Sequence, residues 1–441
     1  MTARARGHLT ASGIATALLA GPWSRRAMVR RVAVALGYAR APRWIGALVD
    51  EVIAAYVRPP ADRPRELALF VRTTQGWERM GPPRRVVHRR PVATTVVRDR
   101  SGPAPLPDAG ALARLLDVDQ GELAWFADAR GLERTVHEPL RHYRWHAVER
   151  RGRLRLLAEP KPRLKEAQRR LLRHVLAPVP VHDAAHGCVP GRSVRTAAEP
   201  HAGRAVVLGM DLEAFFASVP AQRVWGLLQG TAGLPEPVAH LVTALVTTTA
   251  PAAVWRALPV PAGADERERH RRLGERLTAP HLPQGAPTSP ALANLVCYRL
   301  DRRLAGLAGA FGARYTRYVD DLTFSGDRRI GSGRLAAAVT EVAADEGFRV
   351  APTKTRVARA ASRQRVLGTV VNTRPTLSRT ERDALRALLH NCARHGWASQ
   401  VRDHDPATFR DHVLGRVAWA ASLDPVLGAR LRALARQVDW G

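Results

Sequence analysis

Cysteine is scarce in this sequence: Cys188, Cys297 and Cys392 are its only three cysteines, and they lie far apart. An odd number of distant cysteines predicts neither a disulfide framework nor a cysteine-based zinc site, so we expect a cytoplasmic protein. Long apolar runs are missing as well, because no stretch approaches the roughly 20 residues that cross a bilayer. The short apolar stretch at residues 13–20 leads into a basic amphipathic pattern, so we expect neither a secretory signal nor a membrane segment.

Acidic residues are also few. The chain has 39 Asp and Glu against 69 Lys and Arg, which gives a net charge of +30. An arginine-rich genome would explain part of this excess, but Glu could have balanced it and does not. The excess therefore predicts a polyanionic partner.

The length of 441 residues predicts more than one folding unit. Apolar residues at helical spacing in 44–56 predict a helical N-terminal extension, residues 1–97, and a Pro- and Gly-rich linker follows at 98–110. Residues 111–374 mix helical and strand patterns, and residues 375–441 are helical again, so we expect an α+β fold. Within it the patterns predict short helices at 111–116 and 122–126, a hairpin turning at Arg151 and Gly152, a basic helix at 165–175, and a solvated charged insertion at 251–281.

Three acidic residues carry the strongest chemical signal. Asp211 follows the apolar run 206–210, which predicts a buried strand, while Asp320 and Asp321 lie on a turn between two β-prone runs. Carboxylates held close together repel one another unless a cation neutralises them. We therefore expect the fold to pair these strands around two Mg²⁺ ions for phosphoryl transfer. Asp211 and Asp320 are the main expected bridging ligands, Asp321 contributes less directly, and the Leu212 backbone carbonyl is an additional ligand.

Residues 281–290 form a loop stiffened by Pro and Gly between the two acidic positions. Gln284 and Gly285 are expected to let the backbone approach the incoming nucleotide and the template base, because Gly tolerates unusual dihedral angles. Ser289 is expected to cap a following helix. The apolar face of that helix would comprise Leu292, Val296, Leu300, Leu304 and Leu307.

Three further side chains are candidates for handling the nucleotide. Phe216 lies five residues after the first acid, and its bulk would exclude a ribose 2′-hydroxyl and select deoxynucleotides. Arg155 would bind phosphate through its guanidinium fork, and Lys354 would protonate the departing pyrophosphate. Because solvated basic side chains are common in so basic a chain, only position relative to the acids favours these two.

A histidine-framed segment offers weaker candidates. His186 and His201 frame the Gly- and Pro-containing stretch 187–193, and both histidines are predicted, together with Arg192 inside it, to make backbone contacts to the template or nucleotide. Metal ligation by these histidines is not expected, because isolated histidines are more often hydrogen-bonded structural groups.

In their order along the chain, these sequence motifs resemble those of the reverse transcriptase family, and specifically of its bacterial retron type. The resemblance implies fingers and palm in residues 111–374, a helical thumb in 375–441, and Mg²⁺-dependent synthesis of DNA from dNTPs on an RNA template. For retrons it further implies priming from a 2′-hydroxyl of a partner noncoding RNA, a branched RNA–DNA product (msDNA), antiphage defence and an effector protein. The matching stretches are residues 154–160, 185–193, 211–216, 282–290, 318–321 and 366–372.

Two positions depart from the retron pattern. Ala197 stands where the family has Asn, and Leu367 stands where it has Thr. Both departures fall in signatures tied to retron RNA recognition, so they bear on which RNA is used and not on the polymerase chemistry. Two alternatives stay open: a defence-associated reverse transcriptase with another primer, and an RNA-binding protein with a vestigial polymerase site. The three retained acids, together with Gln284, Gly285 and Lys354, argue against the vestigial site. A group II intron enzyme fits less well, because the sequence shows no Cys/His nuclease cluster.

Overall fold

The computed structural model describes residues 3–56, 59–60, 64–82, 86–87, 106–128, 131–134, 136–150, 153–402 and 404–440. Most of the predicted linker, residues 98–105, and the hairpin turn at Arg151 and Gly152 lie outside the described residues. The chain divides into two compact units. Unit 1 comprises Met1–His182, Glu213–Leu300 and Glu341–Arg349, and unit 2 comprises Asp183–Leu212, Asp301–Thr340 and Val350–Gly441. This division does not test the predicted domain boundaries, which stay predictions.

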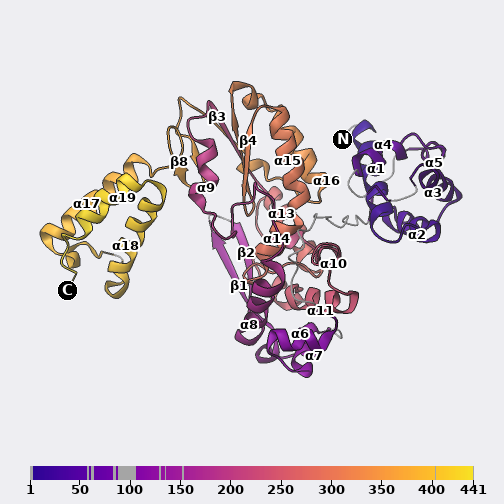
Figure 1. Cartoon of the computed structure of the whole chain (residues 1–441), viewed down its shortest axis with the longest axis horizontal. Helices are drawn as coiled ribbons and strands as arrows, with labels where there is room; N and C mark the ends of the chain where they lie inside the picture. Colours follow the sequence, from indigo (N-terminus) through magenta and orange to yellow (C-terminus); the bar gives the residue numbers. More distant parts are fainter. Residues whose placement is uncertain are drawn as a thin grey trace. The chain divides into compact units, whose positions relative to one another are not determined.

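The N-terminal part of unit 1 is helical, as predicted (Figure 1). Its helices share one apolar core that includes Ile14, Leu18, Met28 and Leu48, all fully buried. Arg31 is buried among them and donates to the carbonyl oxygens of Ala17, Leu18 and Pro22, which satisfies backbone groups at the end of the first helix. The helices are α1 (Ala3–Leu19), α2 (Arg25–Ala35), α3 (Arg43–Ala55), α4 (Pro64–Val71) and α5 (Gln75–Met80).

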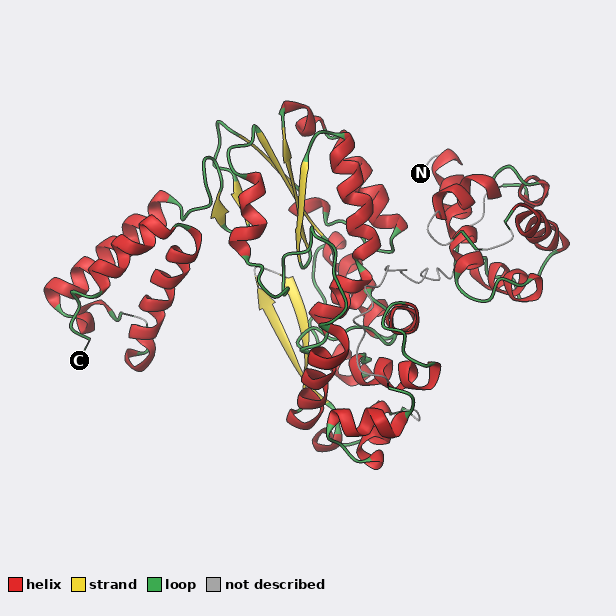
Figure 2. Ribbon diagram, viewed as in Figure 1, coloured by secondary structure: helices red, strands yellow, loops and turns green. Residues whose placement is uncertain are grey.

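The remainder of unit 1 contains the predicted hairpin. Strands β1 (Tyr143–Arg150) and β2 (Arg153–Pro160) pair antiparallel along their full length (Figure 2). The two short helices predicted before the hairpin and the basic helix after it are also present. The helices are α6 (Ala109–Leu116), α7 (Gln120–Ala127), α8 (Pro162–Leu171), α10 (Ala221–Gly230), α11 (Glu236–Val246), α12 (Ala252–Arg256), α13 (Ala264–Leu277) and α14 (Ser289–Val296).

The charged insertion is only partly solvated. The first half of α13 is exposed, but Gly274 and Leu277 in its second half are buried. Trp255 of α12 stacks on His270 of α13 with ring centroids 4.3 Å apart. The prediction of a wholly solvated excursion is therefore wrong, because apolar residues hidden among the charges give α13 a packed face.

The helix predicted after the 281–290 loop is two helices. α14 ends before Cys297, and α15 (Tyr298–Ala310) follows, its residues divided between the two units. The N-cap of α14 is Thr288 rather than Ser289, and its side chain makes no capping hydrogen bond. The apolar spacing is nevertheless confirmed for four of the five predicted residues, since Leu292, Val296, Leu300 and Leu304 are buried, whereas Leu307 is only half-buried.

Unit 2 is built around a four-stranded antiparallel sheet in the order β4-β5-β3-β6. Its inner strand β3 (Val206–Asp211) is buried along most of its length, which confirms the predicted buried strand. The second inner strand is β5 (Asp321–Gly326), and the edge strands are β4 (Arg314–Tyr318) and β6 (Arg356–Arg359). Helix α9 (Val194–Ala198) packs on β4 (Figure 1). Strands β7 (Arg365–Val366) and β8 (Thr369–Val370) complete this region, and the residues of α16 (Arg334–Asp345) are divided between the two units.

The C-terminal part of unit 2 is helical, as predicted. α19 (Pro425–Ala435) packs against both α17 (Arg379–His395) and α18 (Pro406–Leu423) (Figure 2). Ser378, Asp405 and Asp424 cap the three helix N-termini with their side chains. Among the described residues, no helix combines the length and apolar character that crossing a membrane requires.

Candidate active site

The strand register of unit 2 brings the acidic positions together. Asp211, the last residue of β3, lies directly opposite Asp321, the first residue of β5. The Leu212 amide also donates to the Asp320 carbonyl oxygen at 3.0 Å, so the chain leaving β3 is bonded to the turn. Opposed residues of an antiparallel pair share one face of the sheet, with Cβ atoms about 4.5–5.5 Å apart. The predicted pairing of the two acid-bearing segments is therefore confirmed.

The turn between β4 and β5 has an unusual backbone. Val319 has φ +57°, in the left-handed region, where a β-branched side chain is disfavoured. Such a conformation costs on the order of 1–3 kcal/mol and persists only where the surrounding structure imposes it. Gly187 lies so close that a Cβ built on it would be 2.7 Å from the Val319 nitrogen and Cγ2. The carboxylate-bearing turn is thus strained and tightly packed.

The positively charged side chain of Lys354 lies at Asp211. The Lys354 ammonium group forms an ion pair with the Asp211 carboxylate, and the Asp211 carbonyl accepts the Ala351 amide at 2.7 Å. No three His, Cys, Asp or Glu side chains of the described residues are grouped so that they could hold a metal ion. The backbone pairing therefore brings the acids together without grouping their side chains, and Asp211 is turned toward Lys354.

The backbone after Asp211 is held by a cluster that the sequence did not reveal. Glu213 Oε2 lies 3.2 Å from Arg349 Nε and 3.7 Å from Arg272 Nη2 in two ion pairs, while the Glu213 carbonyl accepts a hydrogen bond from Arg276 at 3.2 Å. Two of these arginines come from α13, so the insertion clamps the segment that follows Leu212. The Leu212 carbonyl oxygen accepts no hydrogen bond from the described residues. The acid–arginine pattern in 264–277 was a detectable signal, but helical periodicity alone does not identify its partner.

The two phenylalanines after the acid differ in environment. Phe215 is buried and stacks on Phe348 with ring centroids 5.6 Å apart, whereas Phe216 is only partly buried and meets Phe215 edge to face. Phe215 is therefore a core residue. Phe216 is the one of the pair with surface left to contact a ligand.

The predicted nucleotide loop packs on the hairpin of unit 1. The Gln284 carbonyl accepts the Ala158 amide at 2.8 Å. Gly285 has φ +127°, and a Cβ there would lie 3.0 Å from the Ala158 oxygen, so both conformation and space require glycine. Arg155 is exposed on β2 opposite Val148. Their contacts with phosphate and base stay predictions.

Both histidines lie next to hydroxyl groups of neighbouring side chains, and a template contact of His186 stays a prediction. His201 is fully buried, with Nδ1 2.7 Å from Ser325 Oγ and Nε2 2.8 Å from Thr316 Oγ1. A buried imidazole cannot reach a template strand, so the prediction of a template contact for His201 is wrong. Burial, aided by the charge of Arg192, lowers the pKa of His186 to about 4 and leaves it neutral. Its Nδ1 lies 2.9 Å from Thr196 Oγ1.

Arg192 is held in place by Asp183. Its Nη2 lies 3.2 Å from Asp183 Oδ1, and its Nη1 donates to the Asp183 carbonyl. The contact of Arg192 with a template stays a prediction.

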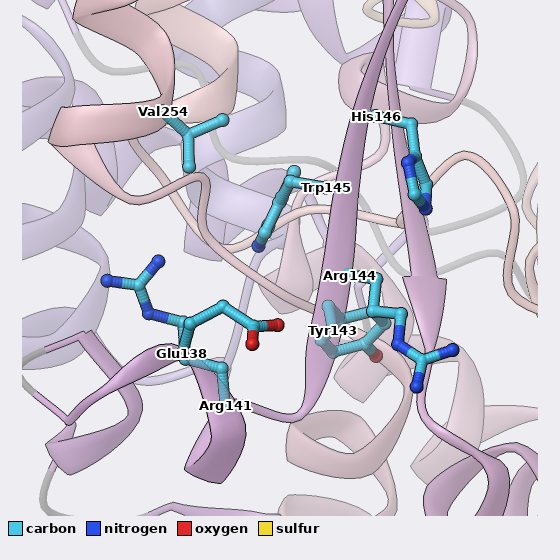
Figure 3. Close-up of a pocket in the computed structure, with 7 residues that line it drawn as sticks. All are labelled: Glu138, Arg141, Tyr143, Arg144, Trp145, His146 and Val254. Carbon is cyan, nitrogen blue, oxygen red and sulfur yellow. The ribbon is translucent and has the colours of Figure 1, made fainter.

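A separate hollow of about 260 Å³ lies on β1 in unit 1 (Figure 3). Tyr143 at its floor is buried, and its hydroxyl accepts from Gln168 at 3.0 Å. Trp145 Nε1 is buried without a partner among the described residues. The hollow is lined by Glu138, Arg141, Tyr143, Arg144, Trp145, His146 and Val254, and none of them belongs to the predicted nucleotide-binding set.

Comparison with known proteins supplies independent information. The sequence profile of the family described as reverse transcriptase (RNA-dependent DNA polymerase) matches residues 147–371. The retron Mx65 reverse transcriptase of Myxococcus xanthus is 42% identical over 349 residues, which cover 77% of each chain. The retron Mx162 reverse transcriptase of the same organism is 42% identical over 309 residues, covering 66% of this chain and 60% of that one.

More distant matches follow. The retron Ec86 reverse transcriptase of Escherichia coli is 28% identical over 295 residues, or 66% of this chain and 79% of its own. Among solved structures, a foamy viral protease-reverse transcriptase in complex with RNA/DNA hybrid aligns over 84% of this chain and 40% of its own, with 13% identity and a TM-score of 0.33. That likeness is too low to support a conclusion about fold or ligands.

Proposed function

Because this chain belongs to the reverse transcriptase family and to its retron type, we propose that it copies a partner noncoding RNA into DNA in a Mg²⁺-dependent reaction. Membership makes it an RNA-directed DNA polymerase; the template, the metal and the product are the proposal. The observation that carries the proposal is the register that sets Asp211 opposite Asp321, beside the turn with Asp320. Adjacent carboxylates are costly in a purely structural role, but they suit nucleotidyl transfer.

The oxygen donors available in unit 2 are of the type that magnesium prefers, although the acidic side chains of the described residues are not grouped around a common point. Mg²⁺ prefers hard oxygen ligands, and this region offers the carboxylates of Asp211, Asp320 and Asp321 together with the uncommitted Leu212 carbonyl. The Asp211 carboxylate already forms an ion pair with a positively charged group, the Lys354 ammonium. We propose that Asp211 and Asp320 would be the main residues to hold two ions, with Asp321 contributing less. The chemistry that Mg²⁺ supplies when bound is a lower pKa for the attacking hydroxyl and neutralisation of the leaving pyrophosphate.

The remaining predicted residues orient the nucleotide. Phe216, half-buried beside the core residue Phe215, is the proposed barrier to a ribose 2′-hydroxyl. Gln284 and Gly285 would shape the base pocket, and exposed Arg155 would bind phosphate. Lys354 would separate from Asp211 and give its proton to pyrophosphate. An ammonium group next to the proposed metal ligands can serve as a general acid.

The RNA partner accounts for the charge of the chain. With a net charge of +30, much of its affinity for RNA would come from phosphate contacts. We propose priming from a 2′-hydroxyl of that RNA, a branched msDNA product, and a part in antiphage defence with an effector protein. We further propose palm and fingers in 111–374, a thumb in 375–441, and a cytoplasmic site of action, in line with three free cysteines.

The test is synthesis in cells that express the chain together with the noncoding RNA encoded beside it. We expect branched RNA–DNA with the wild type and none with the double variant Asp320→Asn, Asp321→Asn. RNA affinity of the variant should stay within about twofold, because binding depends on phosphate contacts. Undiminished synthesis by the double variant in Mg²⁺ would eliminate the assigned acids. Sequencing of copurified nucleic acid identifies the template and the priming nucleotide.

A further inference from the structure

A fully buried ion pair in unit 2 supports the turn between β4 and β5 that carries Asp320, which is the catalytic turn of the proposed function. Arg317 on β4 and Asp301 on α15 both have no solvent-exposed side-chain surface. Arg317 Nε donates to Asp301 Oδ1 at 2.8 Å and Nη2 to Oδ2 at 2.7 Å, a bidentate pair. The Tyr315 hydroxyl donates to the same carboxylate at 2.8 Å. The pair is therefore fixed in one geometry.

The third guanidinium nitrogen reaches the turn itself. Arg317 Nη1 donates to the Val319 carbonyl oxygen at 3.0 Å, which orients the peptide plane between Val319 and Asp320. The next peptide plane is fixed from the other side, because the Leu212 amide donates to the Asp320 carbonyl at 3.0 Å. Since peptide units are planar, holding both planes fixes the backbone dihedrals of Asp320 and hence the direction of its side chain.

The main chain of Arg317 is held as well. Its amide donates to the Ala184 carbonyl at 2.7 Å, and its carbonyl accepts the His186 amide at 2.8 Å. The segment held by these bonds continues into Gly187, which packs on Val319. The 184–187 segment and the guanidinium therefore support the strained turn from two directions.

Stability alone does not account for this pair. Burying two charges carries a desolvation cost, and apolar side chains of similar volume are often as stabilising as a buried ion pair. A donor that meets the Val319 carbonyl while staying paired with Asp301 needs the guanidinium fork, which lysine lacks. Resting on the function proposed above, we propose that Arg317 and Asp301 are positioning residues that aim the Asp320 carboxylate.

The decisive variant is Arg317→Met with Asp301→Leu, which replaces the pair by apolar groups without leaving one charge buried. We expect a folded protein with kcat reduced about 10- to 100-fold, the worth of one hydrogen bond from a charged donor. The KM for dNTP should change little, because the nucleotide contacts are untouched. Arg317→Lys keeps the charge and provides a second folded variant, with an intermediate loss.

A readout independent of catalysis comes from hydrogen exchange in the metal-free protein. The Leu212 amide is bonded to the Asp320 carbonyl and therefore reports on the turn. We expect its exchange to be faster by about tenfold or more in both variants. The matched control is Arg223→Met, since Arg223 is a buried arginine that pairs with Glu346 in unit 1 and does not contact the turn. That control should lose stability without a selective change at Leu212.

The outcomes separate the two proposals. Wild-type rate and wild-type Leu212 exchange in either Arg317 variant would overturn the positioning role. A lower rate with unchanged exchange would overturn it too, because the turn would then not transmit the effect. If the wild-type chain made no DNA, the proposed function would fail, but the exchange comparison would still decide whether the pair holds the turn.

Discussion

Gly187→Ala is the most direct test of how tightly the catalytic turn is packed. The added Cβ would lie 2.7 Å from both the nitrogen and Cγ2 of Val319 and 3.1 Å from the carbonyl carbon of Tyr318. Carbon atoms in contact prefer about 3.5–4.0 Å, so the overlap approaches 1 Å. Two of the three obstructing atoms are backbone atoms, which cannot move aside by changing a rotamer. Either the turn shifts or the 184–187 segment does.

The loss of unfolding free energy and the loss of catalytic rate can both be measured. Overpacking of this kind costs about 1–3 kcal/mol of unfolding free energy. A displacement of about 1 Å at a catalytic group lowers the rate on the order of 100-fold. We therefore expect Gly187→Ala to lower kcat in primer extension at 25 °C by about two orders of magnitude. Urea unfolding at the same temperature checks that the variant is still folded.

The control is Gly306→Ala on α15, where nothing lies within 4 Å of the built Cβ. Alanine is the better helix former by about 1 kcal/mol, so this variant should be at least as stable as the wild type and fully active. Gly187→Ala with unchanged stability and unchanged kcat would refute the reasoning. It would mean that the turn is not constrained by the segment packed on it.

Phe216→Ala should admit ribonucleotides in a competition assay, whereas Phe215→Ala should leave sugar choice intact and cost about 3–5 kcal/mol in urea unfolding; unchanged discrimination would remove Phe216 from the gate. Burial lowers the pKa of His201 to about 3 from an ordinary 6.5. The unfolded chain therefore binds the proton first, and stability should fall as pH drops from about 6.5 toward 3; a His201→Gln variant without a shallower pH slope would contradict this. Glu213→Gln should cost about 1–3 kcal/mol by leaving its arginines without their acid, while Glu275→Gln on the exposed face of α13 should cost under 1 kcal/mol; equal losses in urea unfolding would exclude the clamp.

The local elements were predictable because they depend on short-range patterns. The apolar run before Asp211 predicted β3, and the two β-prone runs on either side of Asp320 and Asp321 predicted β4 and β5. Helical spacing identified the N- and C-terminal helices, although it missed the break at Cys297. A single-residue interruption leaves apolar periodicity almost unchanged, so sequence spacing does not reveal it.

Burial and partner choice were not predictable from spacing. His201 looked like a surface contact, but it is enclosed by Thr316 and Ser325, which are distant in sequence. The 251–281 insertion looked solvated because charge dominates its composition. Its arginines reach Glu213, and periodicity does not identify a partner so far along the chain.

By itself the sequence determined the family through the order of its motifs, and it predicted the chemistry from three acids in strand and turn contexts and from an excess of positive charge. Tertiary structure decided what holds those acids in place. The cross-strand register, the left-handed Val319, the close approach of Gly187 and the buried Arg317 arise only when distant segments meet. The physical reason is that catalytic residue types are local properties, whereas strain and buried charge depend on neighbours that only the folded chain supplies.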